Sequence, residues 1–117
     1  WMAHLRARLG AEGVDTTQQL VRMRDGAHVR VAGHVIVRQR PGTAKGFVFL
    51  TMEDETGLSN AIITPDVYAT FNRTVVDEPY LLIEGTLQNQ DGAVSVKAER
   101  IESLKAQTPA QPSHDLR

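Results

Sequence analysis

The sequence contains no cysteine, and this absence excludes disulfide bonds and thiolate metal sites. No stretch reaches the ~18 consecutive apolar residues of a membrane-spanning helix, so we expect no membrane segment. The absence of cysteine also fits a reducing cytosol, and we expect no signal peptide, since the chain begins at Trp1 without a charged and then apolar leader. Aromatic residues make up only 5% of the 117 residues, so the core must be built from Val, Ile, Leu and Ala.

Catalytic motifs are also missing. The glycine patterns that bind nucleotide phosphates and the G-x-S-x-G pattern of serine hydrolases do not occur. The four histidines stand apart in the sequence, without partners at metal-ligand spacing. Residues 53–55 are acidic, but neighbouring strand residues point to opposite faces and therefore form no acid–base pair. We expect this chain to have no catalytic residues, no metal site and no cofactor of its own.

Charge is unevenly distributed, although the net charge is only −1. Residues 28–52 contain four cations and no acid, whereas residues 53–104 contain ten acids and three bases. The four cations are Arg30, Arg38, Arg40 and Lys45. A basic segment on an otherwise acidic molecule attracts phosphate to one side, or it is simply a solvated face.

Hydrophobic periodicity predicts five strands, with one helix between the third and the fourth. The strands are expected at residues 28–38, 47–54, 58–64, 80–87 and 93–104. Pro65 opens the helix, over residues 65–75, and Gly33 marks a bend or a close backbone approach in the long first strand. This order is the connectivity of the OB fold, a mainly β, five-stranded Greek-key barrel.

We divide the chain into three parts. Residues 1–27 are expected to form a helical linker segment, with short N-terminal helices over residues 2–10 and from Thr16 or Thr17 to about Arg24. Residues 28–104 form the OB-fold domain, and the polar tail, residues 105–117, is expected to be disordered.

Alternation also predicts the buried residues. The expected barrel core is Val29, Val31, Val35, Val37, Val48, Leu50, Met52, Ile62, Leu82, Val94 and Val96. On the helix, Phe71 and Val67, with either Tyr68 or Val75, are expected to close the open end of the barrel.

The strand faces opposite this core carry the candidate binding site. Two outward phenylalanines with cations at their edge are typical of a surface on which the bases of single-stranded nucleic acid stack. The predicted nucleic-acid-binding residues are His34, Arg38, Arg40, Lys45, Phe47, Phe49 and Thr51. In the alternative interpretation, the N-terminal helices or another domain cover the two phenylalanines.

Several segments of the chain resemble one family. Residues 29–57, V-R-V-A-G-H-V-I-V-R-Q-R-P-G-T-A-K-G-F-V-F-L-T-M-E-D-E-T-G, are similar to the C-terminal OB domain of bacterial C-family DNA polymerases. The loop R-Q-R-P-G-T-A-K-G most resembles the error-prone paralogue of the polymerase III alpha subunit. Three later segments of this chain also resemble that domain: P-D-V-Y-A-T-F, L-L-I-E-G-T-L-Q and V-K-A-E-R-I-E-S-L. Its flanking segments are similar to M-A-H-L-R-A-R-L and S-H-D-L-R of this chain.

The resemblance implies a module of a polymerase that copies damaged DNA during the bacterial SOS response, in translesion replication and DNA repair at the nucleoid in the cytoplasm. It implies single-stranded template DNA as the ligand. The implied partners are the rest of the polymerase, an inactive Y-family-like polymerase and a RecA-like accessory protein. Catalytic carboxylates and Mg²⁺ would lie in a palm domain that nothing in this chain matches. The alternative function is a protein-docking module for the accessory proteins or for an upstream polymerase domain.

Overall fold

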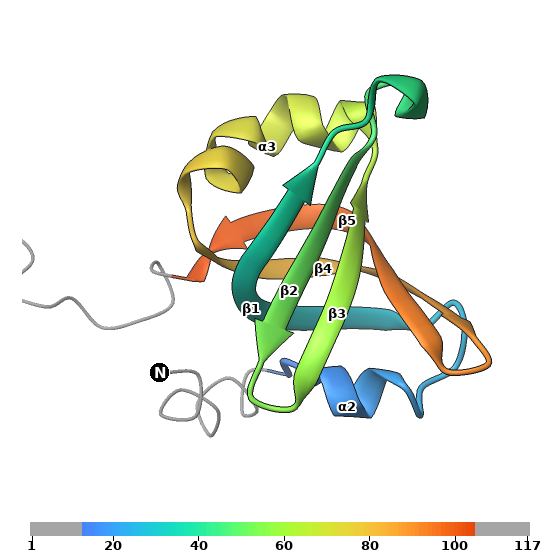
Figure 1. Ribbon diagram of the computed structural model, residues 1–117. Coiled ribbons are helices and arrows are strands. Elements are labelled where there is room, and N and C mark those ends of the chain that lie inside the picture. The colour runs from blue at the N-terminus through green and yellow to red at the C-terminus, as the bar shows by residue number, and fades with distance from the viewer. Residues whose placement is uncertain (1–12, 105–117) are drawn as a thin grey trace, which may run out of the picture.

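The computed structural model describes residues 13–104, and these form a closed five-stranded barrel with the strand order β1-β2-β3-β5-β4 (Figure 1). All neighbouring strands are antiparallel except β3 and β5, which run parallel. The strands are β1 (His28–Gln39), β2 (Val48–Asp54), β3 (Gly57–Ile63), β4 (Tyr80–Gln90) and β5 (Ala93–Ser103). The helix α3 (Pro65–Asp77) lies between β3 and β4 in the sequence, as predicted. The mainly β OB architecture is therefore confirmed.

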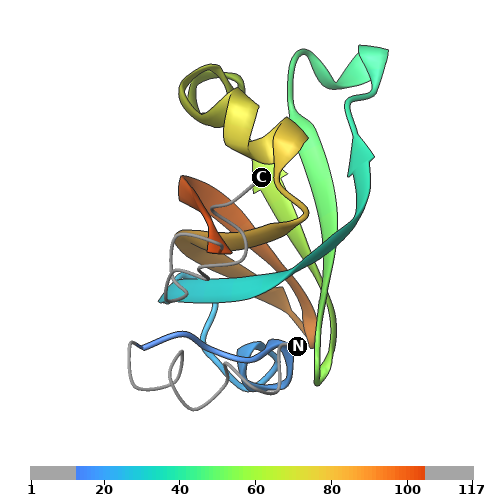
Figure 2. The same ribbon diagram turned by 90° about the vertical axis from the view of Figure 1, so that its left-hand side faces the viewer.

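A helix lies at each end of the barrel. In Figures 1 and 2, α3 lies over one end and the four-residue helix α2 (Thr17–Leu20) lies at the other. Figure 2 also shows that β1 bends strongly, because it first crosses β4 and then continues beside β2. Gly33 lies at this bend, and a Cβ atom there would stand 2.8 Å from the Glu53 carbonyl oxygen, so only glycine fits without a shift.

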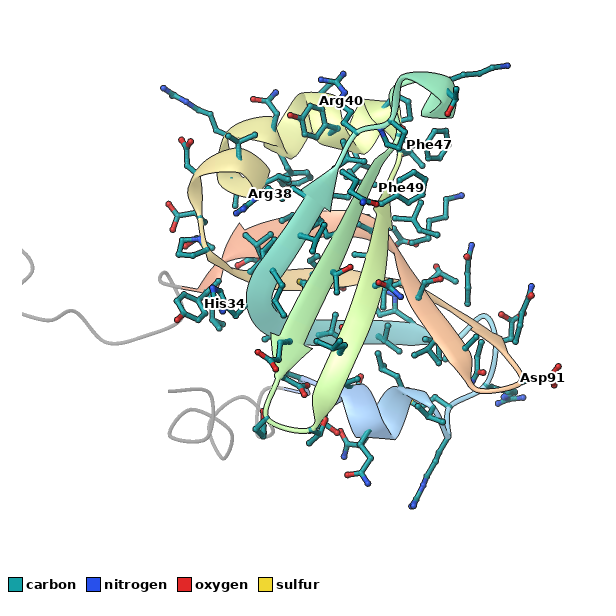
Figure 3. The ribbon with its side chains drawn as sticks, in the orientation of Figure 1. His34, Arg38, Arg40, Phe47, Phe49 and Asp91 are labelled. Atoms are coloured by element: carbon teal, nitrogen blue, oxygen red, sulfur yellow. The ribbon has the colours of Figure 1, made fainter. Side chains whose placement is uncertain are left out.

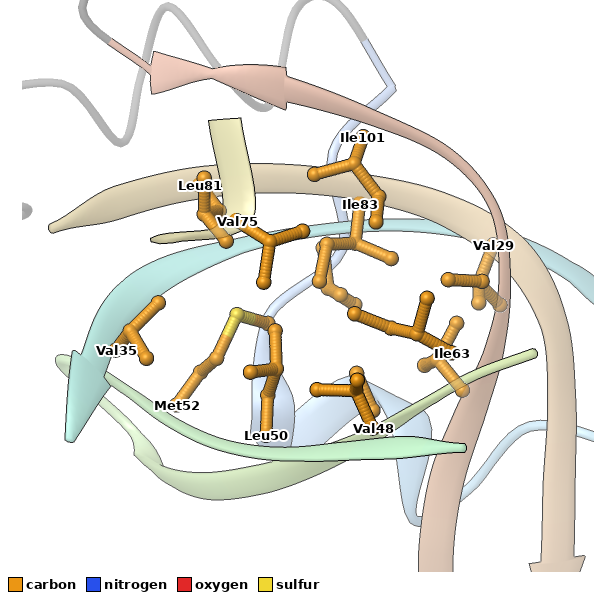
Figure 4. Packing of buried hydrophobic residues seen from close by; sticks show 14 of the residues in the cluster. Val29, Val35, Val48, Leu50, Met52, Ile63, Val75, Leu81, Ile83 and Ile101 are labelled. Carbon is orange, nitrogen blue, oxygen red and sulfur yellow. The ribbon is translucent and has the colours of Figure 1, made fainter. Parts of the chain in front are cut away.

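Aliphatic side chains fill the barrel, as the low aromatic content requires (Figure 4). Each strand contributes the residues of its inner face, and each helix adds one buried side chain, Val75 from α3 and Leu20 from α2. Phe71, Val67 and Tyr68 are only half-buried against this core, so Val75 is the residue of α3 that is fully enclosed. The buried wall includes Val29, Val31, Val35, Val48, Leu50, Met52, Ile63, Leu81, Ile83, Val96 and Ile101.

Four residues of the predicted barrel core lie elsewhere: Leu82 is buried in a second cluster with Val14, Ala32 and Leu104, and three others are not fully buried. The side chain of Val37 is 39% exposed, because a β-bulge between Val35 and Val37 inserts one extra residue and reverses the face that each later residue of β1 presents. Ile62 is half-buried on the outer face, while its neighbours Ala61 and Ile63 enter the core. Val94 is half-buried at the edge of the core.

The N-terminal part of the structure is shorter in helix than predicted. Thr16 caps α2 with its side chain and forms a capping box with Gln19, but the helix ends at Leu20 rather than near Arg24. The predicted helix at residues 2–10 and the predicted tail at residues 105–117 lie outside the described residues.

Two polar side chains of the barrel hold α2 in place. The Asp54 carboxylate accepts hydrogen bonds from the backbone N–H groups of Thr17, Thr56 and Gly57, at 2.7–3.1 Å. Burial raises the pKa of the Asp54 carboxyl, but the hydrogen bonds from Thr17 and Thr56 outweigh it and leave that pKa below its ordinary value. At the other side of α2, the Asn89 amide donates to three carbonyls, those of residues 20, 21 and 23.

Candidate nucleic-acid interface

The outer face of the barrel carries two parallel rows of side chains, because residues paired across strands point to the same side. The first, here called the phenylalanine row, runs across β1, β2, β3, β5 and β4. Its members are Gln39, Phe49, Ile62, Lys97 and Thr86. The second, the amide row, lies two residues away along each strand. Its members are Val37, Thr51, Asn60, Ser95 and Gln88.

The loop between β1 and β2 stands at one end of the phenylalanine row. Phe47 follows this loop, and Figure 3 shows both phenylalanine side chains beside it. Lys45, in a left-handed conformation with φ 55°, and Gly46, with φ 90°, turn the chain sharply before β2. A Cβ atom on Gly46 would stand 3.3 Å from the Pro65 ring, so the loop passes close to the start of α3. Phe47 and Phe49 thus lie near each other at this end of the barrel, and Lys45 belongs to the same loop, two residues before Phe47.

Arg40, the first residue of this loop, contacts an aromatic ring of α3. Its guanidinium carbon lies 4.7 Å from the centre of the Tyr68 ring, within the range of a cation–π contact. The side chain stays exposed, so the guanidinium is oriented by the ring and remains open to a phosphate.

Arg38 does not lie with the phenylalanines, and that part of the prediction is wrong. The bulge in β1 pairs Arg38 with Leu50, a core residue, rather than with Phe49. Its guanidinium donates to the carbonyls of Val75 at 2.7 Å and Glu78 at 2.8 Å, at the C-terminal end of α3. Arg38 therefore satisfies carbonyls that the end of a helix leaves without partners.

His34 also lies apart from Phe47 and Phe49 (Figure 3). It precedes the bulge, and its ring stacks on Tyr80 of β4 with centroids 4.8 Å apart. His34 is exposed and is paired with Glu53, which stands on the same outer face of β2 as Phe49. It therefore shares that face but lies four residues along β2 from Phe49, beside Tyr80 rather than beside the phenylalanines.

The amide row leads into a groove between β3 and the β4–β5 hairpin. This hollow, of about 310 Å³, has no charged residue in its lining: Asn60, Gln88, Gln90, Ala93, Val94 and Ser95. Thr51 is half-buried beside it and donates its hydroxyl to Asn60. Asp91 stands at the tip of the hairpin, so the charge of the site changes from basic at the β1–β2 loop to acidic at the hairpin (Figure 3).

Sequence reasoning missed several residues of this surface. Lys97 lies next to Ile62 in the phenylalanine row and is exposed, and its charge contributes to lowering the pKa of Asp66, after the larger effect of the Thr64 hydrogen bond. The alternation of β5 around buried Val96 and Ala98 signals an outward Lys97. Its place beside Ile62 depends on a parallel pairing of distant segments, which no local pattern reveals.

Residues 13–104 contain no group of three or more His, Asp or Glu side chains placed to hold a metal ion. Over the same residues, the helices are too short or too polar to cross a membrane.

Residues 22–104 match the model of the tRNA anticodon family, described as an OB-fold nucleic acid binding domain, and the chain belongs to this family. The particular relatives are error-prone DNA polymerases. The chain is 44% identical, over 87% of its length, to the error-prone DNA polymerase of Caulobacter vibrioides. It is also 44% identical, over 97% of its length, to that of Mycobacterium bovis. It covers only 9% and 10% of these two relatives, respectively, and so corresponds to one small OB domain of such polymerases.

A solved structure agrees with this assignment. The asparaginyl-tRNA synthetase of Pyrococcus horikoshii matches 76% of the chain with a TM-score of 0.64 and 26% identity, and the match covers 22% of the synthetase chain. The OB fold and the resemblance to error-prone DNA polymerases are both confirmed.

Proposed function

We propose that this chain is the single-strand-binding module of an error-prone DNA polymerase. The observation that carries the proposal is the outward position of Phe49, next to Ile62 and with Lys97 beyond it in the same row. Phe47 lies at the end of this row, and the cations Arg40 and Lys45 belong to the same β1–β2 loop. Aromatic rings with cations at their border bind single strands, because every base has a face that can stack.

The charge distribution favours a short contact with the backbone. Arg40 and Lys45 lie in the loop at one end of the phenylalanine row and Lys97 lies within the row, whereas the groove is neutral and the hairpin tip is acidic at Asp91. Phosphates would therefore be held at one end of the site only. We expect modest affinity and a shallow salt dependence, since each phosphate contact on a single strand contributes about 0.7 to the slope of log K against log salt.

In the intact polymerase, we infer that the module holds the template strand near a catalytic palm domain with Mg²⁺ in another part of the protein. Copying of damaged templates in the SOS response, in the bacterial cytoplasm and together with accessory mutagenesis proteins, is the role that the similarity to error-prone polymerases supports.

Titration of labelled 12-nucleotide single strands at several salt concentrations tests the proposal. Phe49→Ala should weaken binding by about 1–3 kcal/mol without changing the salt slope, because it removes stacking and no charge. Arg40→Ala combined with Lys45→Ala should flatten the slope by about 1.4, the value for two phosphate contacts.

Matched controls lie elsewhere on the surface. Leu58→Ala removes an exposed apolar side chain at the β2–β3 turn, and Arg73→Ala removes an exposed cation of α3. Both should leave affinity and slope unchanged. A wild-type chain that binds no single strand even at low salt contradicts the proposal.

One observation favours protein docking as a second candidate function. Ile36, Val37 and Val76 are 49%, 39% and 55% exposed, a high exposure for apolar side chains. Since the chain spans about a tenth of its relatives, another domain of the same polypeptide is the natural occupant of these side chains. This function predicts that Ile36→Asp disrupts association with the remainder of the polymerase while single-strand binding stays unchanged.

A further inference from the structure

The amide row has a hydrogen-bonding pattern of its own. The Thr51 hydroxyl donates to Oδ1 of Asn60 at 3.2 Å, and the Ser95 hydroxyl donates to Oε1 of Gln88 at 3.4 Å. Asn60 and Ser95 are paired across β3 and β5, and Ser95 and Gln88 across β5 and β4. Thus the hydroxyl of Thr51 donates to the amide oxygen of Asn60 on the next strand, and the hydroxyl of Ser95 donates to the amide oxygen of Gln88.

Each amide oxygen of this row already accepts one hydrogen bond, whereas the two amide nitrogens have no partner within residues 13–104. Both side chains are exposed and line the uncharged groove. An amide nitrogen carries two N–H donors and no acceptor. The groove wall therefore presents hydrogen-bond donors without charge.

The amide row lies within reach of a base that is stacked on Phe49. Residues two apart on one strand face the same side, and a strand rises ~3.3 Å per residue, so the two rows are ~6.6 Å apart. This spacing is comparable to the width of a base. A base stacked on Phe49 thus places its hydrogen-bonding edge near Asn60, one strand away. Gln88 lies three strands from Phe49, so a neighbouring base of the same nucleic-acid strand would meet it.

We propose that Asn60 and Gln88 read base edges and favour bases with an exposed carbonyl over bases with an exposed amino group. Thymine, uracil and guanine carry a carbonyl acceptor where cytosine and adenine carry an amino donor, and two donors facing each other repel. This inference rests on the proposed single-strand binding, and it names the class of base that the site selects.

The sharpest probe compares oligodeoxyuridine with oligodeoxycytidine, both of 12 nucleotides, on the full 117-residue chain. The two bases differ at ring position 4, where uracil has a carbonyl and cytosine an amino group, so backbone charge and ring size are matched. We expect wild-type protein to bind the uridine strand roughly three- to tenfold more tightly, the effect of one or two hydrogen bonds.

Asn60→Ala combined with Gln88→Ala should bring this ratio close to one. Asn60→Asp combined with Gln88→Glu should shift it toward cytidine, since carboxylates accept from the cytosine amino group. Gln18→Ala, which removes an exposed amide on α2, is the control and should keep the wild-type ratio. Phe49→Ala should weaken binding to both strands and leave the ratio unchanged.

The outcomes distinguish the base preference from the proposed single-strand binding. Equal binding of both strands by the wild type overturns the inference and leaves the proposed function standing. Absence of binding to either strand overturns both. A ratio that the double alanine variant retains also overturns the inference, and this remains true for a destabilised variant, because both strands are titrated against the same folded fraction.

Discussion

The two ends of the barrel are closed in different ways. At one end, α3 is 13 residues long, and it packs Val75 into the core with Val67, Tyr68 and Phe71 around it. At the other end, α2 has only four residues, and its single enclosed plug, Leu20, is held in place by hydrogen bonds from the barrel strands. A helix of one turn has no independent stability, so α2 exists because the barrel binds it.

This difference shows how each helix is connected to the candidate interface. The start of α3 lies behind the β1–β2 loop, and its Tyr68 orients Arg40. The α2 segment is tied to the β4–β5 hairpin through Asn89, whose backbone N–H also donates to Asp25. Both loops that border the interface are thus positioned by a helix, one through apolar packing and one through polar contacts.

The largest effect that separates the two ends is expected for Leu20→Ala. The Leu20 side chain is fully buried, and its truncation leaves a cavity between α2 and the barrel. This cavity should destabilise the fold by about 2–5 kcal/mol. Urea denaturation measures this change, and Val21→Ala, at an exposed neighbour, should stay within about 0.5 kcal/mol. A small effect for Leu20→Ala would mean that the barrel is stable without its α2 plug.

The polar attachment of α2 is tested by Asp54→Ala. The substitution removes the acceptor of three backbone N–H groups, and we expect a loss of about 2–3 kcal/mol. Glu53→Gln, at the exposed neighbour, should change stability by less than about 0.5 kcal/mol. Equal stability of Asp54→Ala and wild type in urea would contradict this account of how α2 is held.

The same carboxylate predicts a pH dependence. Its pKa is lower in the folded state than in the unfolded chain, so its contribution is complete above the unfolded value of about 3.9 and is lost as the pH falls through the folded value. The stability difference between wild type and Asp54→Ala should therefore shrink as the pH falls below about 4. A difference that stays constant from pH 7 to pH 3 would contradict the prediction.

At the α3 end, Phe71→Ala should destabilise the protein by about 2 kcal/mol. A fully buried ring would cost about 3–5 kcal/mol, but the ring is only half-buried and Val75 is the enclosed residue. Urea denaturation again gives the change. Val76→Ala, at an exposed position of the same helix, is the control with an expected change within about 0.5 kcal/mol.

The sequence alone predicts the fold well and the interface in part. Alternation, Pro65 and the strand order are local signals, and the strands agree with the structure to within a few residues. The bulge after Val35 has no such signal, because apolar residues continue on both sides of it, and it moved Arg38 and Val37 to the faces opposite to those predicted. The β2–β3 pairing is a local hairpin, but the neighbours from β5 and β4 depend on pairing between distant segments, so the places of Lys97, Ser95 and Gln88 beside β3 could not be predicted.

The smallest expected effect belongs to Arg38→Gln, and it separates a structural role from a binding role. The guanidinium joins β1 to the end of α3 through two carbonyls, so its loss should destabilise the fold by about 1 kcal/mol. Because the side chain lies on the face opposite to Phe49, the salt slope of single-strand binding should stay at the wild-type value. Arg40→Gln is the matched comparison, since it removes an exposed cation of the β1–β2 loop that makes no hydrogen bond to the end of α3 and should flatten the slope by about 0.7. If Arg38→Gln flattens the slope as much as Arg40→Gln does, then Arg38 leaves the helix end to meet a phosphate, and its sequence-based assignment to the nucleic-acid site is restored.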